Sequence, residues 1–88
     1  MVTTTQLLDR ANAWLKEKGE GLLNSHEIVY IMEKIANVLR SEKHSSIDDL
    51  ELNLAISTGI AVCKLRGYDV PDVVRWRGKV VDTVKEEW

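Results

Sequence analysis

The sequence predicts an all-α fold: a small bundle of about four helices, closed either within one chain or by dimerisation. Three observations predict this class. Apolar residues recur at intervals of three and four along most of the 88 residues. Residues that cap helices precede these periodic segments, and glycine or proline separates them. Since no repeat or linker divides the chain, we expect a single domain over residues 1–88.

The first helix is expected over about residues 5–18. Thr3, Thr4 or Thr5 can cap it, because a hydroxyl accepts a hydrogen bond from an N–H of the first turn. Gly19 suits the left-handed conformation that ends helices. The apolar stripe of this helix consists of Leu7, Leu8, Ala11, Trp14 and Leu15.

The second helix is expected from Ser25, its N-cap, to about residue 39, with Glu27 near the positive end of the helix dipole. Its apolar arc is wide, which suggests burial on more than one side. The arc comprises Ile28, Val29, Ile31, Met32, Ile35, Ala36, Val38 and Leu39.

After a polar connection, the third helix is expected to start after Ser45 or Ser46 and to end at Gly67. Its apolar residues occupy nearly the whole circumference between positions 50 and 65, so it lies either at the centre of the bundle or against another subunit. Gly59 inside this helix costs about 1 kcal/mol relative to alanine. A close approach of two helices would explain why glycine stands there.

Two structures remain open for the C-terminal segment. Asp69 can cap a fourth helix with Pro71 in its first turn, where the missing N–H is harmless. The valines between positions 73 and 84 instead prefer strands, and they could form a hairpin that turns at Arg77-Gly78. The cap chemistry favours the helix.

Composition and charge exclude several functions. The net charge of −2 argues against a protein that coats nucleic acid or an anionic membrane. The sequence shows no signal peptide and no apolar run near the roughly 20 residues of a membrane span, so we expect a cytoplasmic protein without a membrane partner. Cys63 has no second cysteine to pair with and joins no Cys/His cluster, so neither structural zinc nor another resident cofactor is expected.

Glu33, Asp48 and Glu51 are the candidate metal ligands. Asp48 and Glu51 are three residues apart and share a helix face, so together with Glu33 they could hold a divalent cation. The alternative is structural, since Asp48 suits the first turn of a helix and Glu33 suits a solvated helix face. We favour the structural interpretation.

The order of these segments resembles the MazG-like nucleotide pyrophosphohydrolases. The resemblance covers most of the chain and is carried by Ala13-Trp-Leu-Lys-Glu-Lys-Gly19, Ile47-Asp-Asp-Leu-Glu51 and Leu65-Arg-Gly-Tyr-Asp69. It implies a helical fold in which a Glu-x-x-Glu pair and a Glu-x-x-Asp pair hold magnesium against the substrate phosphates. Here Ala36 stands three residues after Glu33, and the second pair is Asp48-x-x-Glu51. Because hydrolysis needs several metal ligands, the resemblance implies either an inactive copy or a shared helical topology.

Candidate interface residues lie in two parts of the sequence. Trp76 stands between Arg75 and Arg77, with Lys79 nearby. This pattern suits a protein interface, a base stacked beside phosphate-binding cations, or a tryptophan packed at the edge of the bundle. The remaining candidates are apolar: Leu52, Ile56 and Ile60 of the third helix, and the terminal Trp88.

The sequence therefore predicts a noncatalytic helical interaction module, a homo-oligomer that binds another, unidentified protein, as phage and mobile-element accessory proteins do. The main reason is that the second and third helices carry more apolar surface than a lone bundle can cover. One alternative is a MazG-like, magnesium-dependent enzyme that releases pyrophosphate from nucleoside triphosphates. The other is a nucleic-acid binder whose last two helices form a helix-turn-helix, although acidic residues on the fourth helix disfavour it.

Overall fold

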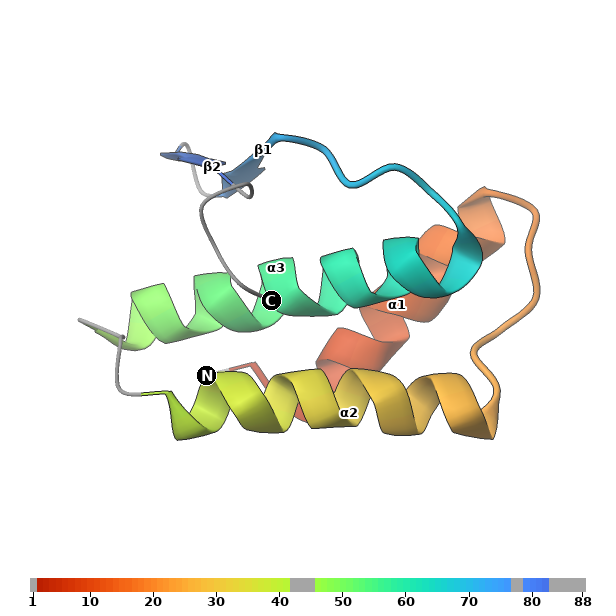
Figure 1. The fold of residues 1–88 in the computed structure, drawn as a ribbon, viewed down its shortest axis with the longest axis horizontal. Helices are drawn as coiled ribbons and strands as arrows, with labels where there is room; N and C mark the ends of the chain where they lie inside the picture. The colour runs from red at the N-terminus through yellow and green to blue at the C-terminus, as the bar shows by residue number, and fades with distance from the viewer. Residues whose placement is uncertain (1, 42–45, 77–78, 83–88) are drawn as a thin grey trace.

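The computed structural model describes residues 2–41, 46–76 and 79–82. Three helices form a small bundle, and a two-stranded antiparallel hairpin follows them (Figure 1). The elements are α1 (Thr4–Glu17), α2 (Ser25–Arg40), α3 (Ile47–Arg66), β1 (Val73–Trp76) and β2 (Lys79–Asp82). The helical bundle confirms the predicted fold class, but the described residues form three helices rather than four. None of these helices is both long and apolar enough to cross a membrane.

Local capping determines where the first two helices begin. Thr3 caps α1 in a capping box, as one of the predicted alternatives stated. Asn24, and not the predicted Ser25, caps α2. The Asn24 side chain accepts a hydrogen bond from the Glu27 N–H at 2.9 Å, and the Glu27 carboxylate accepts one from the Asn24 N–H at 3.1 Å. Only the cap at Asn24 places a glutamate three residues later, where it can return the hydrogen bond.

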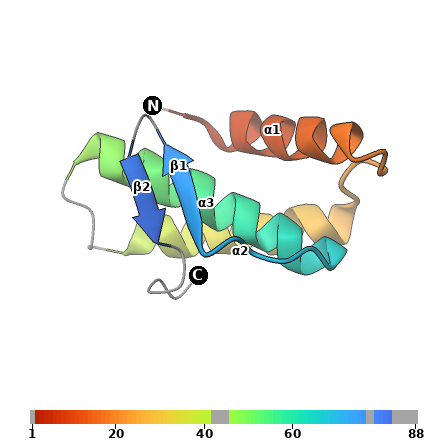
Figure 2. The same cartoon turned by 90° about the horizontal axis from the view of Figure 1, so that it is seen from above.

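α3 lies at the centre of the fold, with α1 and α2 packed on one side and the hairpin lying over the other (Figure 2). Ser46 caps its first turn. Gly67 ends it with a φ of 73°, a left-handed conformation that glycine adopts without strain. The predicted central position is confirmed. The main core consists of Leu7, Ala11, Leu15, Leu23, Ile31, Ile35, Val38, Leu54, Ala61 and Val62.

A second apolar cluster lies on another face of α3. Leu52, Ile56 and Ile60 are only 9%, 6% and 7% exposed, and Val70 from the segment after α3 packs against them. These three residues were predicted to form an interface with another protein. That prediction is wrong, because the chain covers them itself. Cys63, one turn further along the helix, is partly buried.

The prediction of a fourth helix after Asp69 is wrong for the described part of that segment. β1 pairs antiparallel with β2, with Val73 opposite Asp82 and Trp76 opposite Lys79. Branched valine side chains lose freedom in a helix and suit an extended backbone, and this preference prevails over the cap chemistry near Pro71. The hairpin alternative is thus confirmed for the two strands.

A substitution pair tests the assignment of the main core. Leu15 is completely buried, so Leu15→Ala should lower the free energy of unfolding by about 2–5 kcal/mol, measured by urea denaturation. Leu22→Ala is the matched control, because Leu22 is exposed and its truncation should change stability by less than about 0.5 kcal/mol. Similar losses in the two variants would contradict the core described here.

Candidate functional site

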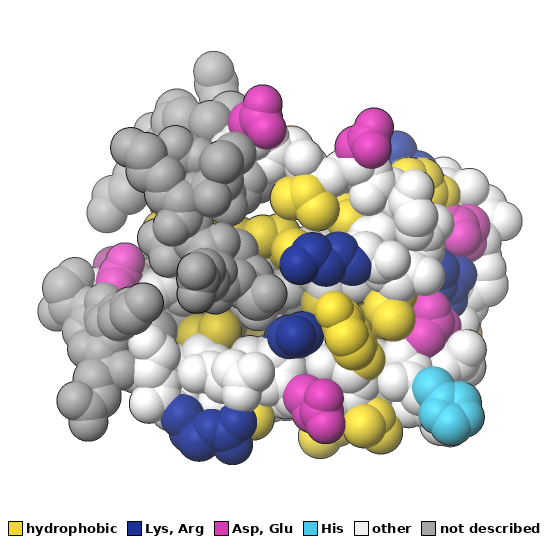
Figure 3. Space-filling model, in the orientation of Figure 1, with side chains coloured by type: hydrophobic (Ala, Val, Ile, Leu, Met, Phe, Trp, Pro, Cys, Tyr) yellow, Lys and Arg dark blue, Asp and Glu magenta, His cyan; other side chains and the backbone are white. Residues whose placement is uncertain are grey.

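A row of hydrophobic side chains remains exposed on α2. We name it the outer stripe and define it as Val29, Met32, Ala36 and Leu39. Val29, Met32 and Leu39 are 58%, 48% and 51% exposed, and Ala36 is half-buried. In Figure 3, hydrophobic side chains reach the surface along the lower edge, where α2 runs, next to acidic and basic ones. Contiguous apolar surface of this kind marks a candidate interaction site.

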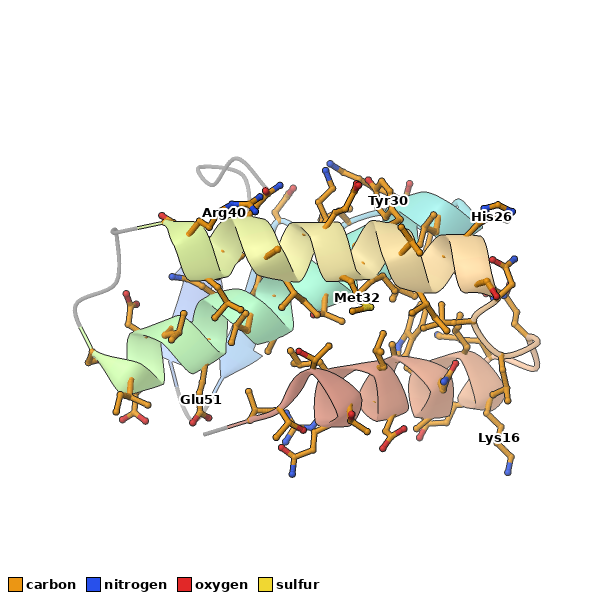
Figure 4. The ribbon with its side chains drawn as sticks, turned by 90° about the horizontal axis from the view of Figure 1, so that it is seen from below. Lys16, His26, Tyr30, Met32, Arg40 and Glu51 are labelled. Carbon is orange, nitrogen blue, oxygen red and sulfur yellow. The ribbon has the colours of Figure 1, made fainter. Side chains whose placement is uncertain are left out.

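The register of α2 explains the outer stripe. Ile31, Ile35 and Val38 are buried in the core, and each precedes a stripe residue by one position, so the stripe occupies the neighbouring arc of the helix. Met32 lies on the side of α2 that faces α1, whereas Arg40 lies along the opposite edge (Figure 4). The intervals of three, four and three residues within the stripe are those of a coiled-coil seam. α2 therefore carries two apolar faces, and the core covers one of them.

Four polar side chains hold the start of α2 against the end of α3. We name them the polar clamp: Glu20, Glu27, Arg66 and Tyr68. The Arg66 guanidinium donates to both carboxylate oxygens of Glu27, from Nε at 2.6 Å and from Nη2 at 2.9 Å. It also donates to the Leu22 carbonyl at 3.2 Å and lies 3.4 Å from Glu20. The Tyr68 hydroxyl donates to the other oxygen of Glu20. Two parallel bonds from a planar guanidinium fix direction as well as distance.

The clamp changes the proton affinity of its members. Hydrogen bonds from Arg66, and then from the Asn24 backbone, hold the pKa of Glu27 below its ordinary value. The same bonds to Glu27 raise the pKa of Arg66. The pKa of Tyr68 is raised, because the neutral phenol donates to Glu20 and an ionised one could not. These shifts favour an ionised Glu27 carboxylate and protonated Arg66 and Tyr68 side chains, so the clamp supports α2 where the outer stripe begins.

A cavity of about 680 Å³ lies between α1, α3 and the segment that follows α3. Trp14 and Tyr68 line it and meet edge to face, with ring centroids 5.1 Å apart and ring planes at 77°. Since Tyr68 belongs to the polar clamp, the clamp also holds the Tyr68 side of the cavity in position. Lys18 stands over the Trp14 ring at 5.4 Å from its centroid. Burial raises the pKa of the Cys63 thiol, which is also on the lining, so the thiol stays neutral at pH 7.

The structure does not bring the predicted metal ligands together. Glu33 is exposed on α2, Asp48 is exposed in the first turn of α3, and Glu51 is half-buried in the next turn. Within residues 2–41, 46–76 and 79–82, no group of three or more His, Cys, Asp or Glu side chains is placed to hold a metal ion. The predicted site with three metal ligands is therefore wrong. Asp48 and Glu51 lie near the start of α3, whereas Glu33 lies on α2, and the three side chains form no metal-binding group.

The basic and aromatic candidates belong to the hairpin segment. Arg75 and Trp76 lie on β1 and Lys79 on β2, but their side chains are not described. Arg77 and Trp88 lie outside the described residues. Because β1 and β2 replace the fourth helix, the predicted helix-turn-helix is wrong.

The wide apolar arc predicted for the second helix contains all four residues of the outer stripe, but neither the stripe as a separate row nor the polar clamp was predicted. A signal for the stripe was present, since its coiled-coil spacing runs beside the core row of α2. The clamp had no such signal. Glu27 and Arg66 are 39 residues apart, and each has a sufficient local explanation as a charge that suits its end of a helix dipole.

No protein-family model, curated protein or solved structure matches this chain. The resemblance to the MazG-like family therefore stays a prediction.

The polar clamp predicts a loss of stability in acid. Because the pKa of Glu27 is lower in the folded than in the unfolded protein, its stabilisation is present above the ordinary glutamate pKa of about 4.3 and is lost as the pH falls through the folded value. Glu27→Gln removes this titration while keeping a side chain that can close the capping box. We expect the urea midpoint of the variant to be lower at pH 7 and to fall less between pH 7 and pH 3.

Glu17→Gln is the control for this experiment, because Glu17 is an exposed glutamate of α1. It should keep the acid dependence of the unchanged protein. An acid dependence in Glu27→Gln as steep as that of the control would show that the clamp does not couple stability to pH.

Proposed function

We propose that the protein is a noncatalytic helical interaction module that binds the apolar face of another protein helix at the outer stripe of α2. The observation that carries the proposal is the set of three large apolar side chains, each about half exposed, in coiled-coil register: Val29, Met32 and Leu39. Because about half of each side chain remains exposed to water in the single chain, burying that half against a partner would stabilise a complex.

The partner that fits this stripe best is a second copy of the chain. When two α2 helices pack antiparallel around a two-fold axis, Met32 of one copy meets Ala36 of the other, and Val29 meets Leu39. A large side chain thus faces a smaller one along the seam.

The size of the stripe sets the strength of this dimer. Full burial of an exposed apolar side chain contributes roughly 1.5–3 kcal/mol, but these side chains are already about half covered. Association itself costs several kcal/mol in lost freedom of motion. A weak, reversible dimer with a dissociation constant on the order of 0.1–1 mM follows.

Sedimentation velocity over about 50 μM to 2 mM protein tests the dimer, because this range spans the expected dissociation constant. Met32→Glu should raise that constant at least about tenfold, since it puts an unpaired charge into both halves of the seam. Leu22→Glu is the control: it places the same charge on an exposed side chain outside the outer stripe. A chain that stays monomeric at every concentration would exclude self-association, and equal effects of the two variants would exclude the stripe as the interface.

An enzymatic assay tests the noncatalytic part of the proposal. We expect no pyrophosphate release from nucleoside triphosphates and Mg²⁺, since among the described residues Glu33, Asp48 and Glu51 form no metal-binding group. Release that Glu51→Gln abolishes, and that Asp9→Asn on the exposed face of α1 leaves unchanged, would contradict the proposal and support the MazG-like alternative.

A further inference from the structure

Met32 differs from the other residues of the outer stripe because its side chain carries sulfur. The chain has two methionines, and the other is Met1. The Met32 side chain is 48% exposed on α2, so reagents dissolved in water can reach its thioether. The residues of the main core are all aliphatic. An oxidant that acts on thioethers therefore changes the outer stripe and spares the core.

A peroxide oxidises a methionine thioether by transferring an oxygen atom to the sulfur. The sulfur lone pair attacks hydrogen peroxide, the O–O bond breaks, and the proton of the transferred oxygen leaves with the departing hydroxide as water. The sulfur is oxidised to a sulfoxide and the peroxide is reduced. The product is a polar side chain of nearly the same size, with an oxygen that accepts hydrogen bonds.

The position of Met32 in the proposed seam makes this change costly for the dimer. In the antiparallel pair, Met32 of one copy meets Ala36 of the other near the two-fold axis, so the contact occurs twice in each dimer. The alanine methyl group cannot donate a hydrogen bond to the sulfoxide oxygen. Burying a polar group without such a bond costs free energy, so oxidation opposes association at both contacts.

The lysine and the arginine of α2 already have partners that compete with a sulfoxide for them. The Lys34 ammonium stands over the Tyr30 ring, 5.0 Å from its centroid. The Arg40 guanidinium donates to the Asn37 side chain. Using either cation to satisfy the sulfoxide oxygen would break one of these interactions, so the cost of burying the sulfoxide is not removed.

Cys63 is the competing sulfur, because it is the one cysteine of the chain. It is partly buried, and burial raises the pKa of its thiol. The thiol therefore stays in the neutral form, which reacts more slowly with peroxide than a thiolate does. Cys63 lies on α3, outside the outer stripe, so its oxidation changes no residue of the seam.

We propose that Met32 is a redox-sensitive modification site: a peroxide converts its thioether to the sulfoxide, and this oxidation dissociates the dimer formed through the outer stripe. The inference rests on the proposed function, because it names the regulation of that same surface. Methionine sulfoxide reductases reverse the modification. The thioether and the sulfoxide are thus two states of a switch between dimer and monomer.

Sedimentation velocity of the full chain before and after treatment with hydrogen peroxide tests this site, with mass spectrometry to show that Met32 has gained an oxygen atom. We expect oxidation to raise the dissociation constant of the dimer at least about tenfold. Treatment with methionine sulfoxide reductases should restore the original constant. The circular dichroism of the helices should stay unchanged, because the core residues are aliphatic.

Met32→Leu is the matched control, because leucine keeps an apolar side chain of similar volume without the sulfur. This variant should dimerise within about threefold of the unchanged protein and should not respond to peroxide. A loss of its dimer on peroxide treatment would assign the effect to another residue and overturn the proposal. Equal dissociation constants before and after oxidation of Met32 would overturn the proposal and leave the dimer standing. A chain that is monomeric before oxidation would instead contradict the proposed function, and this regulation with it.

Discussion

The rest of the structure depends on one constraint: α3 is apolar around most of its circumference, so water must be excluded from more than one of its faces. α1 and α2 cover one side. The other side carries Leu52, Ile56 and Ile60, which no lone three-helix bundle would cover, and the chain returns over it with the segment that includes Val70. The hydrophobic contribution of this second cluster explains why the non-helical segment after α3 is held against that helix.

The polar clamp makes the arrangement of the three helices specific. Apolar packing is nondirectional, whereas the paired hydrogen bonds between Arg66 and Glu27 allow only a narrow range of positions for the two helix ends. Glu27 also closes the capping box of α2, so one carboxylate both starts this helix and attaches it to α3. Through Glu20, the same network orients Tyr68. The outer stripe and the cavity wall therefore share one support.

The outer stripe and the cavity differ in shape. The outer stripe is a convex row on a single helix, which presents apolar area without enclosing anything, and such a surface gains most from another helix with the same spacing. The cavity is concave and is lined by residues of α1, of α3 and of the segment that follows α3. Because α1 contributes to the cavity and α2 carries the stripe, substitutions can affect either surface separately.

The sequence by itself determined the helices, because capping and the 3.6-residue period are local: Thr3 and Gly67 mark helix ends, and the apolar stripe of α1 is the one that packs. It also identified α3 as the central helix from its apolar circumference. Tertiary structure decided what covers α3, since valines 73 and 74 are compatible with either a helix or a strand until a partner strand is available. It decided which half of the α2 arc is buried, because periodicity defines an apolar face but not its neighbours. It also decided the pairing of Glu27 with Arg66, since a contact between residues far apart in the chain depends on how the helices pack.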